Sequence, residues 1–367
     1  MLTTILILLV ALPLGVHLAT TLLALLRLRP RDADPGARPF VSLVRPVCGI
    51  DRFDRETLGS SFAQDYPDYE VIFCAASEED PAVELARALA AAHPQVKSQV
   101  LVGETLFSAN PKLNNLAKGY AAATGGIVVM TDSNLMLPPD YLATLDDSWT
   151  SGTGLVSAPA YGDRPGNFWG AVECAFLNTN QARWQLAADA LGLGFAQGKT
   201  LAWRRDVLDA GGGLAALARN LAEDVASTKL VRAQGLRVRL PARLFAQPIG
   251  PRSARSVWDR QLRWSRVRRD GFPGLFALEI VQGPLLPAVA LGLLVATGTA
   301  PLWSLAALAV IWYGAELGLA RAMGWPATAR DLAAMITRDA LLAPLWFTTF
   351  RARGFTWRGT AMTREAE

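Results

Sequence analysis

Cysteine and histidine are scarce in this 367-residue chain, which has three Cys and two His. Cys48, Cys74 and Cys174 are far apart and form no CxxC pair, and His17 and His93 are equally isolated. Such a set cannot supply a typical zinc site or a histidine-based catalytic triad. The absence of closely spaced cysteines also argues against a disulfide framework and favours a reducing compartment for the soluble part of the chain.

Charge is nearly missing from two long stretches, residues 1–26 and much of 272–350, although 19% of all residues are charged. With 51% hydrophobic residues and a mean hydropathy of +0.23, the chain is too apolar for an ordinary soluble protein. This uneven distribution predicts an N-terminal membrane anchor over 1–27, a soluble body over 39–250, and a membrane-embedded region over 272–350.

The first uncharged stretch, Leu2 to Leu26, has the length that a transmembrane helix needs, and Arg27, Arg29 and Arg31 follow it. Positive residues on that side predict that the body lies in the cytoplasm. A cleaved signal peptide is the alternative. It is disfavoured because the basic residues follow the apolar run and no short apolar region precedes a clear small-residue cleavage site.

A basic segment precedes the second uncharged stretch. Between residues 251 and 271 the chain carries Trp258, Trp264 and seven arginines: Arg252, Arg255, Arg260, Arg263, Arg266, Arg268 and Arg269. Nucleic acid is one candidate partner for such a segment. An Arg- and Trp-rich helix directly before an apolar run sits more naturally at an anionic membrane surface, so we predict an interfacial helix and no nucleic-acid partner.

Two apolar runs follow, Phe272 to Thr297 with Glu279 inside it, and Pro301 to Leu319 with Glu316 inside it. Both are long enough to cross a bilayer, and a short turn joins them. They therefore predict a transmembrane hairpin whose two ends are cytoplasmic.

The last apolar piece, Ala340 to Phe350, is too short to span a membrane alone and has Arg338 and Asp339 at its edge. We predict that it is re-entrant or interfacial. Residues 351–367 are predicted to form a basic cytoplasmic tail.

Strand-like and helix-like segments alternate in the body. The strand-like segments are 40–47, 70–75, 99–102, 127–130, 155–158, 200–203 and 237–240. Such alternation predicts an α/β fold with a mostly parallel sheet. Ligands of such sheets bind at the carboxyl ends of the strands, so polar residues that follow a strand are the first candidates for a site.

The strongest candidate follows the apolar strand Ile127 to Met130, which a Gly pair opens and Asp132 closes. Asn134 lies two positions further on. Carboxylate and amide oxygens are suited to holding Mg²⁺ or Mn²⁺ against a nucleotide diphosphate. The alternative is ordinary turn or helix-capping chemistry, in which Asp-Ser-Asn is common.

Other polar residues stand where helices are predicted to begin. Asp80 precedes a proline and could be a simple N-cap. Lys112 and Asn114 open a helix, where they could bind an anion or serve as caps. Glu223 and Asp224 begin another helix, and acids at that position usually complement the helix dipole.

Three acidic sites and an Arg-Trp site follow one another in a fixed order: Asp80, Asp132, Asp224, and then Arg260 to Trp264, which reads RQLRW. This ordered set resembles the D, D, D, (Q/R)xxRW pattern of processive-type and lipid-directed inverting glycosyltransferases with the GT-A fold. Longer strings, such as VSLVRP, NPKLNNL and RDVLD, are most similar to the ceramide glucosyltransferase family. The resemblance extends from Val41 to Trp264.

The resemblance implies transfer of glucose, or a related hexose or hexuronic acid, from a UDP-sugar to the primary hydroxyl of ceramide. It also implies a divalent cation, Mg²⁺ or Mn²⁺, held by Asp132 and Asn134 against the donor diphosphate. Lys112 and Asn114 fall in the predicted donor-binding region. The expected location is a bacterial inner membrane, in a multi-pass protein.

The reaction assigns roles to the remaining residues. Asp224 is the expected general base for the acceptor hydroxyl, with Glu223 as its rival. Arg263 is expected to bind phosphate through its guanidinium, and Asp80 to hold the base or ribose of the nucleotide. Trp264 is expected to form a wall for the acceptor, and Arg260 belongs to the same substrate-binding motif.

Two positions depart from the family pattern. Asn134 stands where Gly commonly follows Asp-Ser, and Gln181-Ala182-Arg183 stands where eukaryotic members have His-Pro-Arg. These departures leave the donor sugar and the acceptor lipid open. One alternative is transfer of N-acetylglucosamine to a hopanoid lipid, and another is a non-catalytic membrane scaffold that binds lipid.

Overall fold

The structure is a computed structural model that describes residues 1–27, 38–220, 222–352, 354–357 and 360–362. The chain divides into two compact units. We call one the membrane unit (Met1–Leu28, Gly162–Ala187 and Ile249–Phe355) and the other the sheet unit (Arg29–Tyr161, Ala188–Pro248 and Thr356–Glu367).

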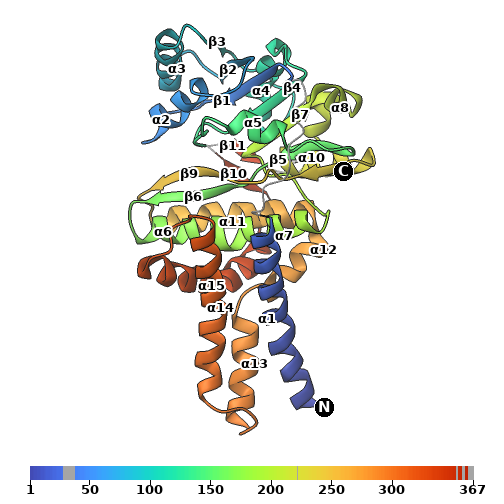
Figure 1. The fold of residues 1–367 in the computed structure, drawn as a ribbon, viewed down its shortest axis with the longest axis vertical. Helices are drawn as coiled ribbons and strands as arrows, with labels where there is room; N and C mark the ends of the chain where they lie inside the picture. Colours follow the sequence, from blue (N-terminus) through green and yellow to red (C-terminus); the bar gives the residue numbers. More distant parts are fainter. Residues whose placement is uncertain (28–37, 221, 353, 358–359, 363–367) are drawn as a thin grey trace. The chain divides into compact units, whose positions relative to one another are not determined.

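A seven-stranded sheet organises the sheet unit, with the strand order β3-β2-β1-β4-β7-β5-β8 (Figure 1). The strands are β1 Val41–Pro46, β2 Tyr69–Ala75, β3 Lys97–Val102, β4 Ile127–Thr131, β5 Thr153–Ser157, β7 Thr200–Arg204 and β8 Arg237–Arg239. Neighbouring strands are parallel except at β7, which runs antiparallel to both β4 and β5. The predicted α/β fold with a mostly parallel sheet is confirmed.

Apolar residues cover both faces of this sheet. Along β1, Leu43 belongs to one hydrophobic cluster and Val44 to the other, and along β4, Val129 and Val128 divide in the same way. Successive side chains of a strand point to opposite faces, so continuous apolar runs are what a sheet buried on both sides requires. These runs made the strands predictable.

The helices of the sheet unit are α2 Asp54–Gly59 with a 3₁₀ turn Ser60–Phe62, α3 Pro81–Ala92, α4 Pro111–Ala122, α5 Tyr141–Asp146, α8 Arg205–Ala210, α9 Gly213–Leu217 and α10 Glu223–Ala233. Asp80 caps α3 and Asn110 caps α4, each accepting a hydrogen bond from the second helical residue. A proline at the first helical position completes both starts.

Two short strand pairs were not predicted. One consists of β6 Ala160–Pro165 and β9 Phe245–Gly250. The other consists of β10 Phe355–Trp357 and β11 Thr360–Met362, which fall in the predicted basic tail. Segments of three to six residues with mixed polarity carry too little periodicity to stand out in a sequence.

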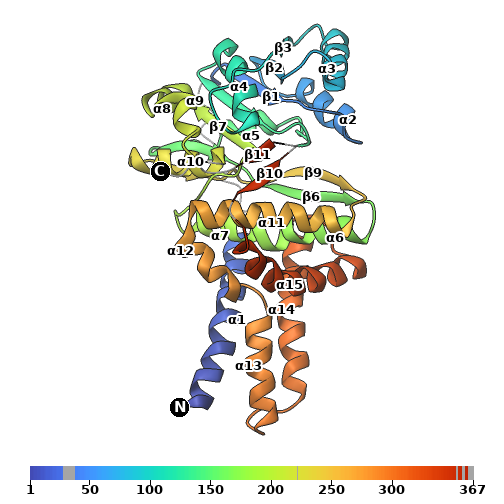
Figure 2. The ribbon, with the colours of Figure 1, turned by 180° about the vertical axis from the view of Figure 1, so that it is seen from behind.

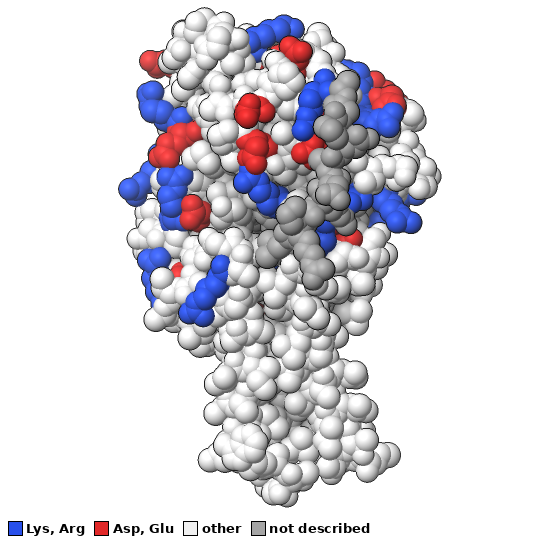
Figure 3. All heavy atoms as spheres, viewed as in Figure 1, with Lys and Arg blue, Asp and Glu red and all other residues white. Residues whose placement is uncertain are grey.

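Among the described residues of the membrane unit, three helices are long and apolar enough to cross a membrane: Leu2–Leu26, Pro273–Ala296 and Trp303–Ala322. They correspond to α1 (Leu2–Leu26), to α12 (Pro273–Ala277), a 3₁₀ turn (Leu278–Val281) and α13 (Leu285–Ala296), and to α14 (Trp303–Ala322). Helix α1 packs against α13 and α14 (Figure 2). On the face shown in Figure 3, the part of this unit built from α1, α13 and α14 carries no charged side chains at its lower end. The anchor and the hairpin fit a membrane-associated protein.

The remaining helices of the membrane unit are α6 Phe168–Ala175, a π-helical turn η2 Phe176–Ala182, α7 Arg183–Ala190, α11 Ala254–Gly271 and α15 Ala329–Thr349. The predicted basic helix corresponds to α11. The predicted short piece Ala340 to Phe350 is the second half of α15, which begins at a capping box of Thr328 and Asp331 and packs against α6 and α11. The first half of this helix carries an apolar stripe instead of an apolar run, so the sequence pattern predicted only its second half.

Candidate active site

The turn that follows β4 positions Asp132 at the carboxyl edge of the sheet. Its backbone N–H donates to the Lys199 carbonyl over 3.2 Å. Its own carbonyl accepts from Arg45 Nη2 over 2.8 Å, and Arg45 Nη2 also lies 2.9 Å from the carbonyls of Ser133 and Leu135. A fully buried guanidinium from β1 therefore fixes the turn that carries Asp132.

Two lysines pair with the Asp132 carboxylate, one at each oxygen. Lys112 Nζ lies 2.7 Å from Oδ1 and Lys199 Nζ lies 2.9 Å from Oδ2. Both lysine side chains are 8% exposed, whereas that of Asp132 is 25% exposed. Burial alone would raise the pKa of Asp132, but the two ammonium groups hold it well below its usual range. The carboxylate is thus charged and reachable from solvent.

Lys199 also connects Asp132 to Asn134, because its Nζ lies 2.9 Å from Asn134 Oδ1. The two oxygens predicted to bind a cation therefore converge on one positive charge. Carboxylate and amide oxygens are the ligands that a hard divalent cation uses, so cation binding by Asp132 and Asn134 stays a prediction. The described residues contain no group of three or more His, Cys, Asp or Glu side chains that could hold a metal, so substrate phosphate and water would have to complete the coordination.

The acidic pair at the start of α10 lies in the same site, but its two members have different hydrogen-bond partners. Glu223 Oε1 is 2.7 Å from Lys112 Nζ, and Oε2 accepts from Asn110 Nδ2 over 2.9 Å. Among the described residues, Asp224 accepts from backbone N–H groups, that of Val225 over 2.7 Å and that of Gly198 over 3.2 Å. Burial and the charge of Glu223 raise the pKa of Asp224 to about 6. A carboxylate in this state can accept a proton near neutral pH.

The backbone of Gly198 bonds to both Lys112 and Asp224. Its carbonyl accepts from Lys112 Nζ over 2.7 Å while its N–H donates to Asp224. A Cβ at this position would lie 2.6 Å from Glu223 Oε1 and 3.3 Å from Lys112 Nζ, so no larger residue fits without moving the charged groups. The structure thus brings Asp132, Lys112, Asn134 and Asp224 together.

Asp80 and Asn114 bond to backbone instead. Asp80 caps α3 and accepts from the Gly49 N–H over 2.9 and 3.0 Å, which joins the ends of β1 and β2. Asn114 Oδ1 accepts from the Ser108 N–H over 3.0 Å, and its Nδ2 donates to the Ser108 carbonyl over 3.0 Å. Both residues therefore shape loops at this edge, and direct contact with a substrate stays a prediction for each.

The RQLRW motif lies on α11 in the membrane unit. Arg260 Nη1 pairs with Glu173 Oε1 over 2.5 Å, and its guanidinium carbon lies 4.6 Å from the centroid of the Trp264 ring. Gln261, which is 2% exposed, accepts from Gln181 Nε2 over 3.1 Å. One departure from the family pattern, Gln181, thus contacts this motif directly. Arg263 lies on the same helix.

A family model described as Glycosyl transferase family 21 matches residues 4–366. The chain belongs to glycosyl transferase family 21. This membership confirms the resemblance that the ordered acidic residues and the RQLRW motif indicate.

Curated relatives of this family 21 chain include ceramide glucosyltransferases. It is 29% identical to ceramide glucosyltransferase 1 of Caenorhabditis elegans, over 77% of the chain and 60% of that protein. It is also 29% identical to the ceramide glucosyltransferase of Komagataella phaffii, over 62% of the chain and 56% of that protein. The chain thus spans less than two thirds of the length of these two relatives.

Among solved structures, the mannosyltransferase PcManGT from Pyrobaculum calidifontis, in complex with GDP-Man and Mn²⁺, is similar over nearly its whole length. The match covers 96% of this chain and 99% of that chain, with a TM-score of 0.60 and 21% sequence identity. At this identity the likeness concerns the fold alone. It confirms the predicted GT-A-like architecture for this family 21 member.

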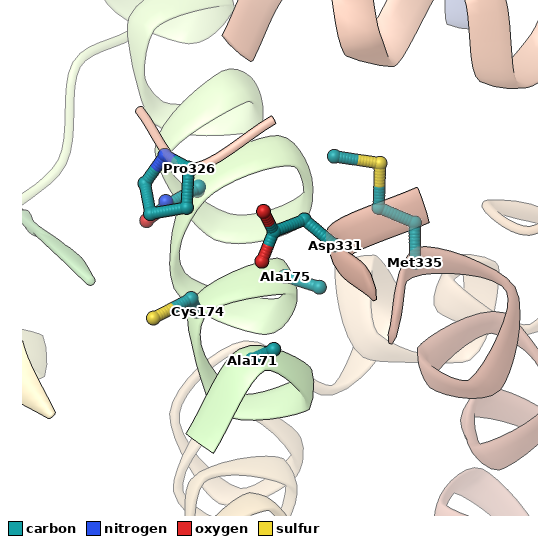
Figure 4. A pocket seen from close by; sticks show the side chains of 7 residues that line it. Ala171, Cys174, Ala175, Pro326, Asp331 and Met335 are labelled. Carbon is teal, nitrogen blue, oxygen red and sulfur yellow. The ribbon is translucent and has the colours of Figure 1, made fainter. Parts of the chain in front are cut away.

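A small pocket lies in the membrane unit, and the Asp331 carboxylate at the start of α15 points toward it (Figure 4). Its walls are small or apolar side chains together with Asn178 and Asp331; they are Ala171, Cys174, Ala175, Asn178, Pro326, Asp331 and Met335. Its volume of about 10 Å³ is close to what one water molecule needs. It contains none of the predicted site residues.

Proposed function

We propose that this family 21 member is a membrane-bound inverting glycosyltransferase that moves a sugar from a UDP-sugar to the primary hydroxyl of ceramide. The observation that carries the proposal is the convergence of Asp132, two buried lysines and Asp224 at one edge of the sheet. A diphosphate leaving group needs positive charge, and an attacking hydroxyl needs a proton acceptor. The names of the curated relatives support ceramide as the acceptor.

Positive charge for the leaving diphosphate would come from the chain itself and from a divalent cation. Lys112 and Lys199 supply two ammonium groups within hydrogen-bonding distance of Asp132. A divalent cation held by Asp132 and Asn134 would neutralise further charge on the departing UDP. Arg263 would add a guanidinium, whose planar fork matches phosphate oxygens.

Asp224 would act as the general base. The acceptor oxygen forms a bond to the anomeric carbon from the face opposite UDP, the bond to the diphosphate oxygen breaks, and the hydroxyl proton passes to the Asp224 carboxylate. Its raised pKa of about 6 supports this role, because such a group is still largely ionised at pH 7 yet takes up a proton readily. Glu223 is already paired with Lys112 and Asn110.

The remaining roles follow from position and side-chain chemistry. Asp80, at the joined ends of β1 and β2, would hold the base or ribose of the nucleotide. Trp264 would form an apolar wall for the acceptor lipid, and Arg260, which stacks on it, would keep that ring in place. With three candidate spans, the protein would lie in a bacterial inner membrane with the sheet unit on the cytoplasmic side.

Purified membranes carrying the full-length chain would test the proposal. They are supplied with Mn²⁺, ceramide and one UDP-sugar at a time, and UDP release and lipid products are measured. We expect UDP release that depends on ceramide, and a product in which the anomeric configuration is inverted.

The same assay separates the alternatives. Transfer from UDP-N-acetylglucosamine to a hopanoid polyol, with none to ceramide, would replace the proposed acceptor. If no lipid acceptor stimulated UDP release from any donor, the chain would be a binding protein that keeps the fold.

A further inference from the structure

Lys199 occupies the point on which the predicted cation ligands converge. It directly precedes β7, its side chain is 8% exposed, and its Nζ lies 2.9 Å from both Asp132 Oδ2 and Asn134 Oδ1. The other oxygen of Asp132, Oδ1, is bound by Lys112. A divalent cation that used Asp132 Oδ2 and Asn134 Oδ1 would therefore have to displace Lys199 but could leave Lys112 in place.

Lysine is suited to such an exchange. Its ammonium is a compact charge on a flexible four-carbon stem, so it can change partners by side-chain rotation while the backbone stays fixed. The backbone here is fixed, because the Lys199 carbonyl accepts from the Asp132 N–H and Thr200 begins a strand that pairs with β4. The ammonium can thus move away from Asp132 while remaining at the site.

We propose that Lys199 is the resident cation of the donor-free site, and that it transfers to the diphosphate of the donor when a divalent cation takes its place between Asp132 and Asn134. This inference rests on the proposed use of a nucleoside diphosphate donor. It assigns Lys199 two successive partners: first the carboxylate and amide oxygens, and then the phosphate oxygens.

The proposal makes cation binding depend on the donor. Without a nucleotide, a divalent cation must expel a buried ammonium from the carboxylate that pairs with it, which is unfavourable. With UDP present, the expelled ammonium gains phosphate oxygens, so each ligand favours the other. The two binding events are therefore coupled, and coupling of this kind is reciprocal.

Lys199→Met tests the proposal, because methionine keeps an unbranched apolar stem and removes the ammonium with its charge. Mn²⁺ binding to the full-length protein in detergent is followed by electron paramagnetic resonance, with and without UDP, and UDP binding is followed by calorimetry. We expect Lys199→Met to bind Mn²⁺ about tenfold more tightly than wild type when UDP is absent, and to bind UDP about tenfold more weakly when Mn²⁺ is present. Lys229→Met, at an exposed lysine of α10 that donates to Asn220, is the matched control and should change neither affinity.

The opposite signs of the two effects exclude a merely structural role. If Lys199→Met weakened both Mn²⁺ and UDP binding, or changed neither, Lys199 would not be the resident cation. Lys199→Gln, which can still donate to Asp132 and Asn134, should show the same two shifts while keeping the wild-type thermal midpoint.

Neither titration needs an acceptor lipid or a turnover, so the outcome is independent of whether ceramide is the substrate. Failure of ceramide transfer with both shifts intact would overturn only the proposed acceptor.

Discussion

The two units each contain a buried cluster of charges, and the clusters differ in access. In the sheet unit, Asp132 is 25% exposed although both of its lysine partners are buried. In the membrane unit, Glu316 and Arg338 are each 1% exposed and form two bonds of 2.9 Å. The first cluster can exchange a partner for a ligand. The second is closed to solvent, so we expect its charges to contribute to stability and not to ligand binding.

The closed cluster joins helices that are distant in sequence. Thr179, in the π-helical turn, donates to Glu316 Oε2 over 2.7 Å and accepts from Arg338 Nη1 over 2.9 Å. Arg183, just after that turn, donates to Thr20 Oγ1 of α1 over 2.5 Å. Polar side chains of α1, α14 and α15 thus meet at one turn. Buried charges that satisfy one another in this way become costly when one of them is removed.

Asp132→Ala, in the solvent-accessible cluster of the sheet unit, should have the largest effect on turnover. We expect transfer to be abolished, because Lys112 and Lys199 lose their shared carboxylate and the proposed cation site loses a ligand. The fold should survive, since no core cavity is created and Lys112 keeps its pairing with Glu223. UDP release and circular dichroism of the purified protein measure the two properties. Near-wild-type turnover in the presence of EDTA would contradict the role given to Asp132.

Asp224→Asn should lower turnover by roughly 10²- to 10⁴-fold, the range typical of losing a general base. UDP binding should be retained, because Asn keeps the size and most of the hydrogen bonding of Asp. Glu223→Gln is the matched comparison and should lower turnover much less, although it weakens the pairing with Lys112. If Glu223→Gln were inactive and Asp224→Asn active, the base would be Glu223.

Arg338→Met tests the closed cluster and should act on stability instead of chemistry. Removing one partner of a buried ion pair costs about 3–5 kcal/mol, because the other charge is left uncompensated. We therefore expect a lower thermal midpoint in detergent, with turnover per folded molecule close to wild type. Adding Glu316→Gln should recover part of the loss. A double variant less stable than the single would show that Glu316 has other essential partners.

The smallest effect concerns pH. Because the proposed general base Asp224 would act in its ionised form and its pKa is about 6, kcat/KM should fall about tenfold between pH 7 and pH 5. The raised pKa of Asp224 also makes the stability of the folded protein depend on pH. The folded state holds this proton more tightly than the unfolded state, so the free energy of unfolding contributed by Asp224 falls as pH rises from about 4 to about 6. Asp224→Asn should therefore flatten the pH dependence of the thermal midpoint in that window, and an unchanged slope would contradict the raised pKa.

Sequence patterns predicted the features that depend on one segment at a time. The anchor Leu2–Leu26, the strands of the main sheet and the capped starts of α3 and α4 follow from apolar runs and helix-capping residues. The position of Asp132 at the carboxyl edge of the sheet also followed from its strand, whereas Asp224 joined the predicted site through the family resemblance.

Features that depend on how segments pair were missed. Lys199 reaches Asp132 because β7 is antiparallel to β4, so Thr200 lies opposite Thr131 and the start of one strand meets the end of the other. The role of Arg45 was missed for a similar reason, since the sequence around an arginine in an apolar strand does not indicate which carbonyls it will bind. The Glu316–Arg338 pair emerges only when α14 and α15 pack.

In the sequence, residues 162–187 of the membrane unit lie between two segments of the sheet unit. The two units are therefore synthesised in alternation. Helix α1 is synthesised before β1 to β4, and these strands are synthesised before the π-helical turn, which belongs to the membrane unit. Lys199 and Asp224 are made only afterwards, so the candidate active site cannot be completed until the chain already carries its anchor. The apolar helix α1 would thus be available to a bilayer before Lys199 and Asp224 exist.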